Sequence, residues 1–186
     1  LEEAIHSELS GNVIDLCLEL TGYLSGSLSR QPPHYFLKIG RSIERADMTT
    51  RVIDVGCLNL MERAPQRGQA EDNILWMGVL TSLNAYQMYR QAVQERVRDS
   101  LVTDFLLRDP SFPRSVMHSI ASLRESFEKL PRHTDPKREA DTMMKKLSAL
   151  DVQSVLEHDG LHEWIDEFQS DMNHIHTAIT DTWFLR

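Results

Sequence analysis

The sequence predicts an all-α protein: an antiparallel bundle of six to seven helices that forms one domain over residues 1–186. Three observations support this prediction. Long segments are rich in Leu, Met, Ala, Glu, Arg and Gln, which favour helices, and their apolar residues recur at the 3.6-residue helical period. The seven prolines lie between these segments, where helices begin or end. No alternating strand pattern bounded by turn residues is present.

Prolines and loop-forming residues set the limits of the first four helices. Pro32 and Pro33 separate the first helix from the second, and residues 64–69 form the most loop-like segment of the chain. Cys17 lies among leucines in the first helix, which predicts a buried, inert thiol. The four helices are expected at residues 1–28, 34–63, 71–96 and 100–107.

The later helices have the clearest apolar faces. Ser111 is expected to cap the fifth helix, with Pro113 in its first turn. A sixth helix is expected from Pro136, and a short helical turn after Asp151. The last helix has the most regular apolar stripe, and a stripe of this width needs a partner helix to cover it. The expected ranges are 111–130, 136–150 and 161–184, and the last stripe contains Leu161, Trp164, Ile165, Phe168, Met172, Ile175, Ile179 and Trp183.

The composition excludes several classes of function. The formal net charge is −8, from 20 basic and 28 acidic residues, and nucleic-acid binding relies on a basic surface, so no nucleic-acid partner is expected. No apolar run approaches the roughly 20 residues of a membrane span, so no membrane association is expected. The acidic N-terminal segment does not resemble a signal peptide. Two cysteines are too few for a disulfide framework, which indicates a reducing, cytoplasmic location.

Charge is distributed unevenly along the chain. The net charge is −5 for residues 1–29, +4 for 30–150 and −7 for 151–186. Two acidic ends packed against a basic middle would be complementary. The alternative is that exposed faces simply differ in sign.

The second helix carries charged residues where core residues are expected. Projected at 100° per residue, it has two apolar stripes, and Arg41 and Glu44 lie in or beside the second one. Such charges need partners when they are buried, and Arg41 with Glu44 or Asp47 with Arg51 has the spacing of a helical pair. An arrangement of Glu44 between Arg41 and Arg45 leaves spare guanidinium donors, which suit bidentate capture of a carboxylate or phosphate. The stripes are Ile39, Ile43, Ala46, Ile53 and Cys57, and Leu37, Met48, Val52 and Val55.

Two interpretations of this charged cluster follow. It is either a structural ion network that fixes the register of the bundle or a site for a ligand or partner. Substitution of Arg45 by Ala distinguishes them, because a large loss of stability with unchanged binding favours the structural role.

The same helix contains the motif Phe36-Leu37-x-Ile39-Gly40-Arg41-x-Ile43-Glu44-Arg45-Ala46-Asp47-Met48-Thr49-Thr50-Arg51. This motif resembles the signature of the bacterial alpha-E domain family, which is named for its predicted α-helices and its Glu-Arg motif. Other segments are also similar, so the resemblance covers essentially the whole chain. They are residues 21–26, 74–76, 85–90, 105–107, 112–115 and 160–163.

The resemblance has implications for site residues and partners. Family members are longer, which implies that this chain is the C-terminal portion of a longer protein. Some relatives are joined to, or encoded near, ATP-grasp-type ligases and transglutaminase-like proteins. This implies, by analogy, an accessory role in making or modifying small peptides. The residues that match the family motif are Arg41, Glu44, Arg45, Asp47 and Arg51, and Arg114 matches a Phe-Pro-Arg-Ser element.

Three functional hypotheses follow. The first is a non-catalytic binding or scaffold module without a cofactor, which acts beside an ATP-grasp-type ligase and presents its Arg/Glu site to a partner enzyme, a small anionic peptide or a nucleotide. The second is an enzyme of peptide synthesis or modification, with Glu44 as general base and Arg41, Arg45 and Arg114 as anion clamps. The third is a homodimer built on the last helix.

A di-metal carboxylate site is a further alternative, because helical bundles build such sites from Glu-x-x-His pairs on facing helices. Glu3 and His6 have this spacing, and Asp171 and His174 nearly so. The bridging glutamates on other helices are not evident, so no metal is expected.

Overall fold

Every regular element in the described chain is a helix. The computed structural model describes residues 2–61, 69–157 and 160–185, and no strand occurs in these ranges. The all-α prediction is therefore confirmed, and the short helices α4 and α8 raise the number above the expected six to seven. The helices are α1 (Glu2–Ser27), α2 (Pro32–Met61), α3 (Gln69–Ser82), α4 (Tyr86–Ala92), α5 (Asp99–Arg108), α6 (Val116–Phe127), α7 (Thr134–Ala149), α8 (Val152–Glu157) and α9 (Leu161–Trp183).

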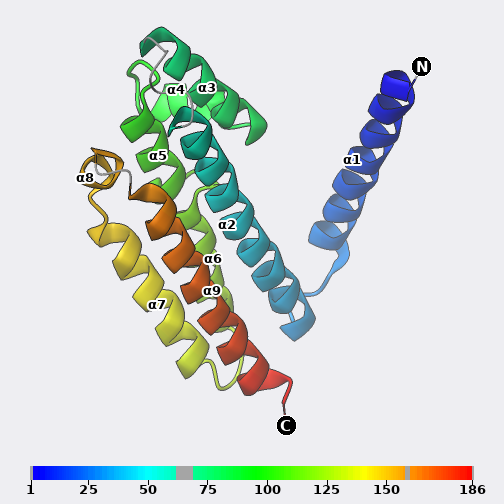
Figure 1. The fold of residues 1–186 in the computed structure, drawn as a ribbon. Helices are drawn as coiled ribbons and strands as arrows, with labels where there is room; N and C mark the ends of the chain where they lie inside the picture. Colours follow the sequence, from blue (N-terminus) through cyan, green and yellow to red (C-terminus); the bar gives the residue numbers. More distant parts are fainter. Residues whose placement is uncertain (1, 62–68, 158–159, 186) are drawn as a thin grey trace.

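Four long helices form the bundle that positions the site. α2 packs along α6 and α9, and α7 packs against the same two helices, so the four lie side by side (Figure 1). Each contributes fully buried side chains, such as Ile53 from α2, Leu123 from α6, Leu147 from α7 and Phe168 from α9. Burying one side chain of this size stabilises the fold by about 1.5–3 kcal/mol. The remaining helices α3, α4, α5 and α8 gather at the end of the bundle where α2 finishes.

The apolar stripe of α9 is covered within the chain. α9 packs against α7 and α2, which supply the partner helices that the sequence pattern requires. The homodimer that the sequence hypothesis places on this helix stays a prediction. The buried residues of the stripe are Leu161, Ile165, Phe168, Met172, Ile175 and Ile179.

The third predicted helix, residues 71–96, is broken in the structure. α3 ends at Ser82, Asn84 adopts a left-handed conformation with φ of 50°, and α4 starts at Tyr86. Asn tolerates this conformation better than most residues. The turn buries Leu83 and Ala85 and allows Tyr89 to enter the core. The single-helix prediction was wrong because the apolar period continues through the turn.

The helix predicted from Ser111 begins five residues later, at Val116. Ser115 caps it, because its Oγ accepts the His118 backbone N–H at 3.0 Å. The intervening turn is held by Asp109, whose carboxylate accepts the backbone N–H groups of Ser111 and Phe112, each at 2.8 Å. This turn places Arg114 and the first residues of α6 beside α2.

Helix α1 stands away from the bundle (Figure 1). Cys17 is exposed, so the prediction of a buried thiol was wrong, and Leu16 is 64% exposed. The second apolar stripe of α2 is also largely uncovered, since Met48 is 53% and Val55 57% exposed. Among the described residues, no helix is long and apolar enough to cross a membrane.

Candidate functional site

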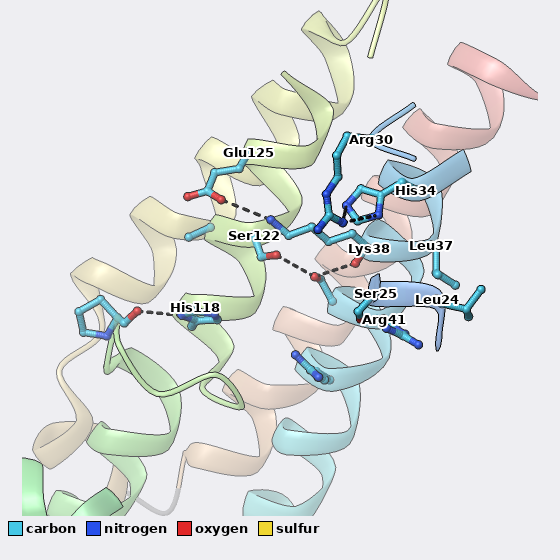
Figure 2. Close-up of a pocket in the computed structure, with 14 residues that line it drawn as sticks. Leu24, Ser25, Arg30, His34, Leu37, Lys38, Arg41, His118, Ser122 and Glu125 are labelled. Carbon is cyan, nitrogen blue, oxygen red and sulfur yellow. Dashed lines mark hydrogen bonds and ion pairs between the residues drawn. The ribbon is translucent and has the colours of Figure 1, made fainter. Parts of the chain in front are cut away.

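The candidate site is an open pocket between α2 and α6, closed at one side by the last turns of α1 (Figure 2). Its volume is about 650 Å³, which lies within the range of small-molecule sites. The lining residues are Leu24, Ser25, Arg30, His34, Leu37, Lys38, Arg41, Ser42, Arg45, Pro110, His118, Ala121, Ser122 and Glu125.

One face of α2 supplies a row of nitrogen-bearing side chains to this pocket. His34, Lys38, Arg41 and Arg45 follow one another at intervals of four, three and four residues, which places them on one side of a helix. At a rise of 1.5 Å per residue, the row is about 17 Å long. Arg30, just before α2, extends it.

Three arginines gather at one end of the row. Burial of the Arg45 guanidinium lowers its pKa, and the positive charges of Arg114 and Arg41 lower it further. The Arg41 Nη2 donates to Thr21 Oγ1 of α1 at 3.2 Å. Among the described residues, no carboxylate forms an ion pair with any of these three guanidinium groups. The structure therefore concentrates positive charge here without neutralising it.

The opposite end of the row is partly neutralised. Lys38 Nζ lies 3.5 Å from Glu125 Oε2, and Glu125 is the one carboxylate among the described residues that line the pocket. Arg30 Nη1 lies 2.9 Å from the His34 ring nitrogens. Partial desolvation and the charges of Arg30 and Lys38 lower the pKa of His34, so this ring is neutral and accepts from Arg30.

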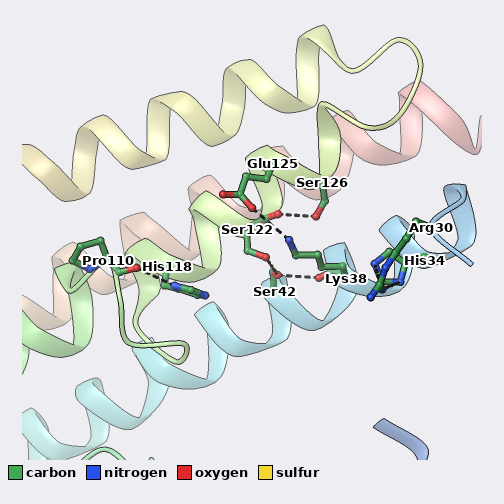
Figure 3. A network of polar contacts seen from close by, with 9 residues as sticks. All are labelled: Arg30, His34, Lys38, Ser42, Pro110, His118, Ser122, Glu125 and Ser126. Atoms are coloured by element: carbon green, nitrogen blue, oxygen red, sulfur yellow. Dashed lines mark hydrogen bonds and ion pairs between the residues drawn. The ribbon is translucent and has the colours of Figure 1, made fainter. Parts of the chain in front are cut away.

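Two hydroxyl groups line the middle, and a second histidine lies beyond them, on the side away from Arg30 and His34 (Figure 3). The Ser42 hydroxyl donates to the Lys38 carbonyl at 2.9 Å and lies 3.2 Å from Ser122 Oγ. His118 Nδ1 lies 3.0 Å from the Pro110 carbonyl. Because a carbonyl only accepts, His118 Nδ1 carries a proton, and Nε2 is left for a ligand in the pocket.

The structure brings together only three of the six residues that the sequence singled out. Arg41 and Arg45 line the pocket and Arg114 lies close to them. Glu44 is exposed, does not line the pocket, and forms no ion pair with another described residue, so the expected Arg–Glu–Arg arrangement is not formed.

Asp47 and Arg51 form a separate surface pair. Their Oδ2 and Nε atoms are 2.7 Å apart, and this hydrogen bond raises the pKa of Arg51. Exposed i,i+4 pairs of this kind contribute little to stability. Arg51 also borders a second, mostly apolar hollow between α2 and α3, away from the arginine cluster.

Sequence reasoning missed Arg30, His34, Lys38 and His118. A signal for two of them was present, because His34 and Lys38 continue the helical spacing of Arg41 and Arg45. The position of His118 depends on the packing of α6 against α2, which a single sequence does not show.

The described residues contain no group of three or more His, Cys, Asp or Glu side chains that could hold a metal ion. Asp171 instead pairs with Lys146 at 2.7 Å. The side chains of Glu3 and His6 lie outside the described part of the structure.

The fold and the pocket define a helical-bundle protein with an arginine-rich surface cavity. The sequence model of the Alpha-E family, described as a predicted alpha-helical domain with a conserved ER motif, matches residues 1–184. The chain belongs to this family. Comparisons with curated proteins and with solved structures find no match.

The chain contains three Glu-Arg pairs: Glu44-Arg45, Glu62-Arg63 and Glu95-Arg96. The second pair lies outside the described residues. In the third, Glu95 pairs with Arg98 at 2.5 Å on the surface. Of the two described pairs, only Glu44-Arg45 supplies an arginine to the pocket.

Proposed function

We propose that this protein is a non-catalytic binding module whose pocket receives the anionic group of a small peptide, a nucleotide or a partner protein. The observation that supports this most strongly is the group formed by Arg41, Arg45 and Arg114, three guanidinium groups without a carboxylate partner in the described chain. Arginine is suited to bidentate binding of carboxylate and phosphate.

The energetics of the cluster support a binding role over a purely structural one. Like charges held together repel, and partial burial adds a desolvation cost. The lowered pKa of Arg45 reflects both effects. A structural network would pair Glu44 with the arginines, and Glu44 instead forms no ion pair with another described residue and does not line the pocket. A bound anion would relieve the repulsion, so the cluster is suited to an anionic ligand, which no described carboxylate replaces.

The cellular role that we propose is accessory to an ATP-grasp-type peptide ligase, or to a transglutaminase-like protein, in the cytoplasm. Membership of the Alpha-E family supports this by analogy.

The enzyme hypothesis receives less support from the geometry. Its general base, Glu44, does not line the pocket, and a base must lie within hydrogen-bonding reach of the proton that it removes. We therefore keep the binding function and assign no catalytic role to Glu44.

The test is the Arg45→Ala variant, measured for both stability and binding. We expect its melting temperature to equal or exceed that of the wild type, because the substitution removes one of three neighbouring positive charges. Its affinity for triglutamate or tripolyphosphate, measured by titration calorimetry, should fall about tenfold.

Arg90→Ala is the matched control, since Arg90 is exposed on α4 and changes the net charge equally. It should leave both measurements unchanged. A fall of about 4 °C or more in the melting temperature of Arg45→Ala, with unchanged affinity, would show that the cluster is structural.

A further inference from the structure

We propose that the ligand of this pocket is a short acidic peptide, bound in extended conformation along α2, with carboxylates on alternate residues facing Lys38, Arg41 and Arg45. This inference rests on the proposed anion-binding function and specifies the ligand class. The observation behind it is that the cationic side chains lie in a row along α2. A single small anion would contact only part of this row.

The spacing of the row matches an extended peptide. Along α2, Arg41 and Arg45 are about 6 Å apart, and Lys38 and Arg45 about 10.5 Å. In an extended chain, side chains on one face repeat about every 6.6 Å. Three alternate acidic residues therefore span about 13 Å, which the flexible arms of Lys and Arg can match. A compact anion such as inorganic phosphate would contact only one end of the row.

The excess positive charge of the pocket also favours a ligand with several anionic groups. Arg30, Lys38, Arg41 and Arg45 line it against the single carboxylate of Glu125. The Lys38–Glu125 contact is long, at 3.5 Å, and the two side chains are 41% and 66% exposed. Such pairs are weak, so Lys38 can turn from Glu125 to a ligand carboxylate.

The remaining lining residues favour a peptide over a nucleotide. Ser42 and Ser122 place hydroxyl groups along the middle of the groove, where a peptide backbone offers both donors and acceptors. Leu24, Leu37 and Ala121 provide apolar surface for side-chain stems. The lining residues include no Trp, Tyr or Phe on which a nucleobase would stack, and their aromatic rings are the smaller ones of His34 and His118.

The test compares two peptides of identical composition and charge, Glu-Ser-Glu-Ser-Glu and Glu-Glu-Glu-Ser-Ser, each with a C-terminal fluorophore. Their affinity for the full 186-residue chain is measured by fluorescence anisotropy, alongside competition by ATP and tripolyphosphate. When extended, the alternating peptide presents three carboxylates on one face and the block peptide presents two. We expect the alternating peptide to bind about fivefold more tightly.

The Lys38→Ala variant should reduce this preference, because it removes the third cation. Lys145→Ala is the control, since Lys145 is exposed on α7, away from the groove. Equal binding of the two peptides by the wild type would overturn the proposal that the peptide binds in an extended conformation with alternate carboxylates facing α2. Tighter binding of ATP or tripolyphosphate than of either peptide would overturn the peptide assignment while leaving the anion-binding function intact. Failure of all these anions to bind would overturn both proposals.

Discussion

At the scale of single residues, Arg45 shows what the sequence can and cannot predict. Its helical face, and its proximity to Arg41, follow from the 3.6-residue period. The approach of Arg114 does not, because that residue comes from a turn 69 positions later in the chain, held by Asp109. Within the described residues, the lack of a carboxylate paired with the cluster depends on packing, and it favours an anion site over an ion network.

His162 provides a residue-level prediction on pH dependence. Its Nδ1 lies 2.7 Å from Asp54 Oδ1, which joins the first turn of α9 to α2, and this hydrogen bond and the charge of Asp54 raise the pKa of His162 above 6.5. Because the folded-state pKa is raised, the pair stabilises the fold fully below about pH 6.5 and loses this contribution as pH rises through the folded-state value.

We therefore expect the melting-temperature difference between wild type and His162→Asn to be larger at about pH 6 than at about pH 9. The control is His174→Asn, a substitution of an exposed histidine on the same helix. A difference for His162→Asn that does not change with pH would contradict the assigned role of the pair.

At the scale of helices, the sequence predicts that a helix is present more reliably than it predicts where the helix begins and ends. The ranges of α2, α7 and α9 are close to those expected, because prolines and apolar stripes define them. The break at Asn84 and the start of α6 at Val116 were missed. Both are set by tertiary burial, of Tyr89 in the first case and of Phe112 and Ser115 in the second.

Two glycines of α2 give opposite predictions for the same substitution. A Cβ at Gly56 would lie 2.7 Å from Val79 Cγ2, so Gly56 permits the close approach of α3, and Gly56→Ala should destabilise the protein by about 1–3 kcal/mol. A Cβ at Gly40 meets nothing within 4 Å, so Gly40→Ala should stabilise it by up to about 1 kcal/mol.

Urea denaturation monitored by circular dichroism measures both free energies. If both glycine variants changed stability in the same direction, the close packing of α2 on α3 would be contradicted.

At the scale of the whole molecule, the uneven charge of the chain has two different outcomes. The acidic C-terminal segment does pair with the basic middle, as in Lys146 with Asp171. The acidic N-terminal helix α1 instead stands apart from the bundle, with Leu16 and Cys17 exposed (Figure 1). The sign of a segment's charge thus does not determine whether it packs, because packing also depends on where the chain turns between helices.

The packing of the whole molecule also explains how an acidic protein presents a cationic site. The overall charge is −8, but the packing of α2 against α6 places Arg41 and Arg45 in one cavity, with Arg114 close to Arg45. Composition argues correctly against a general polyanion-binding surface, and it does not exclude a local site for a small anion.

The central claim is that Arg41 and Arg45 bind an anion in the pocket between α2 and α6. Its most direct test is a crystal structure of the protein grown in the presence of sulfate, an analogue of phosphate and carboxylate ligands. We expect a sulfate ion within hydrogen-bonding distance of both Arg41 and Arg45. A pocket without an anion, with Arg45 paired to Glu44, would contradict the claim and identify the cluster as a structural ion network.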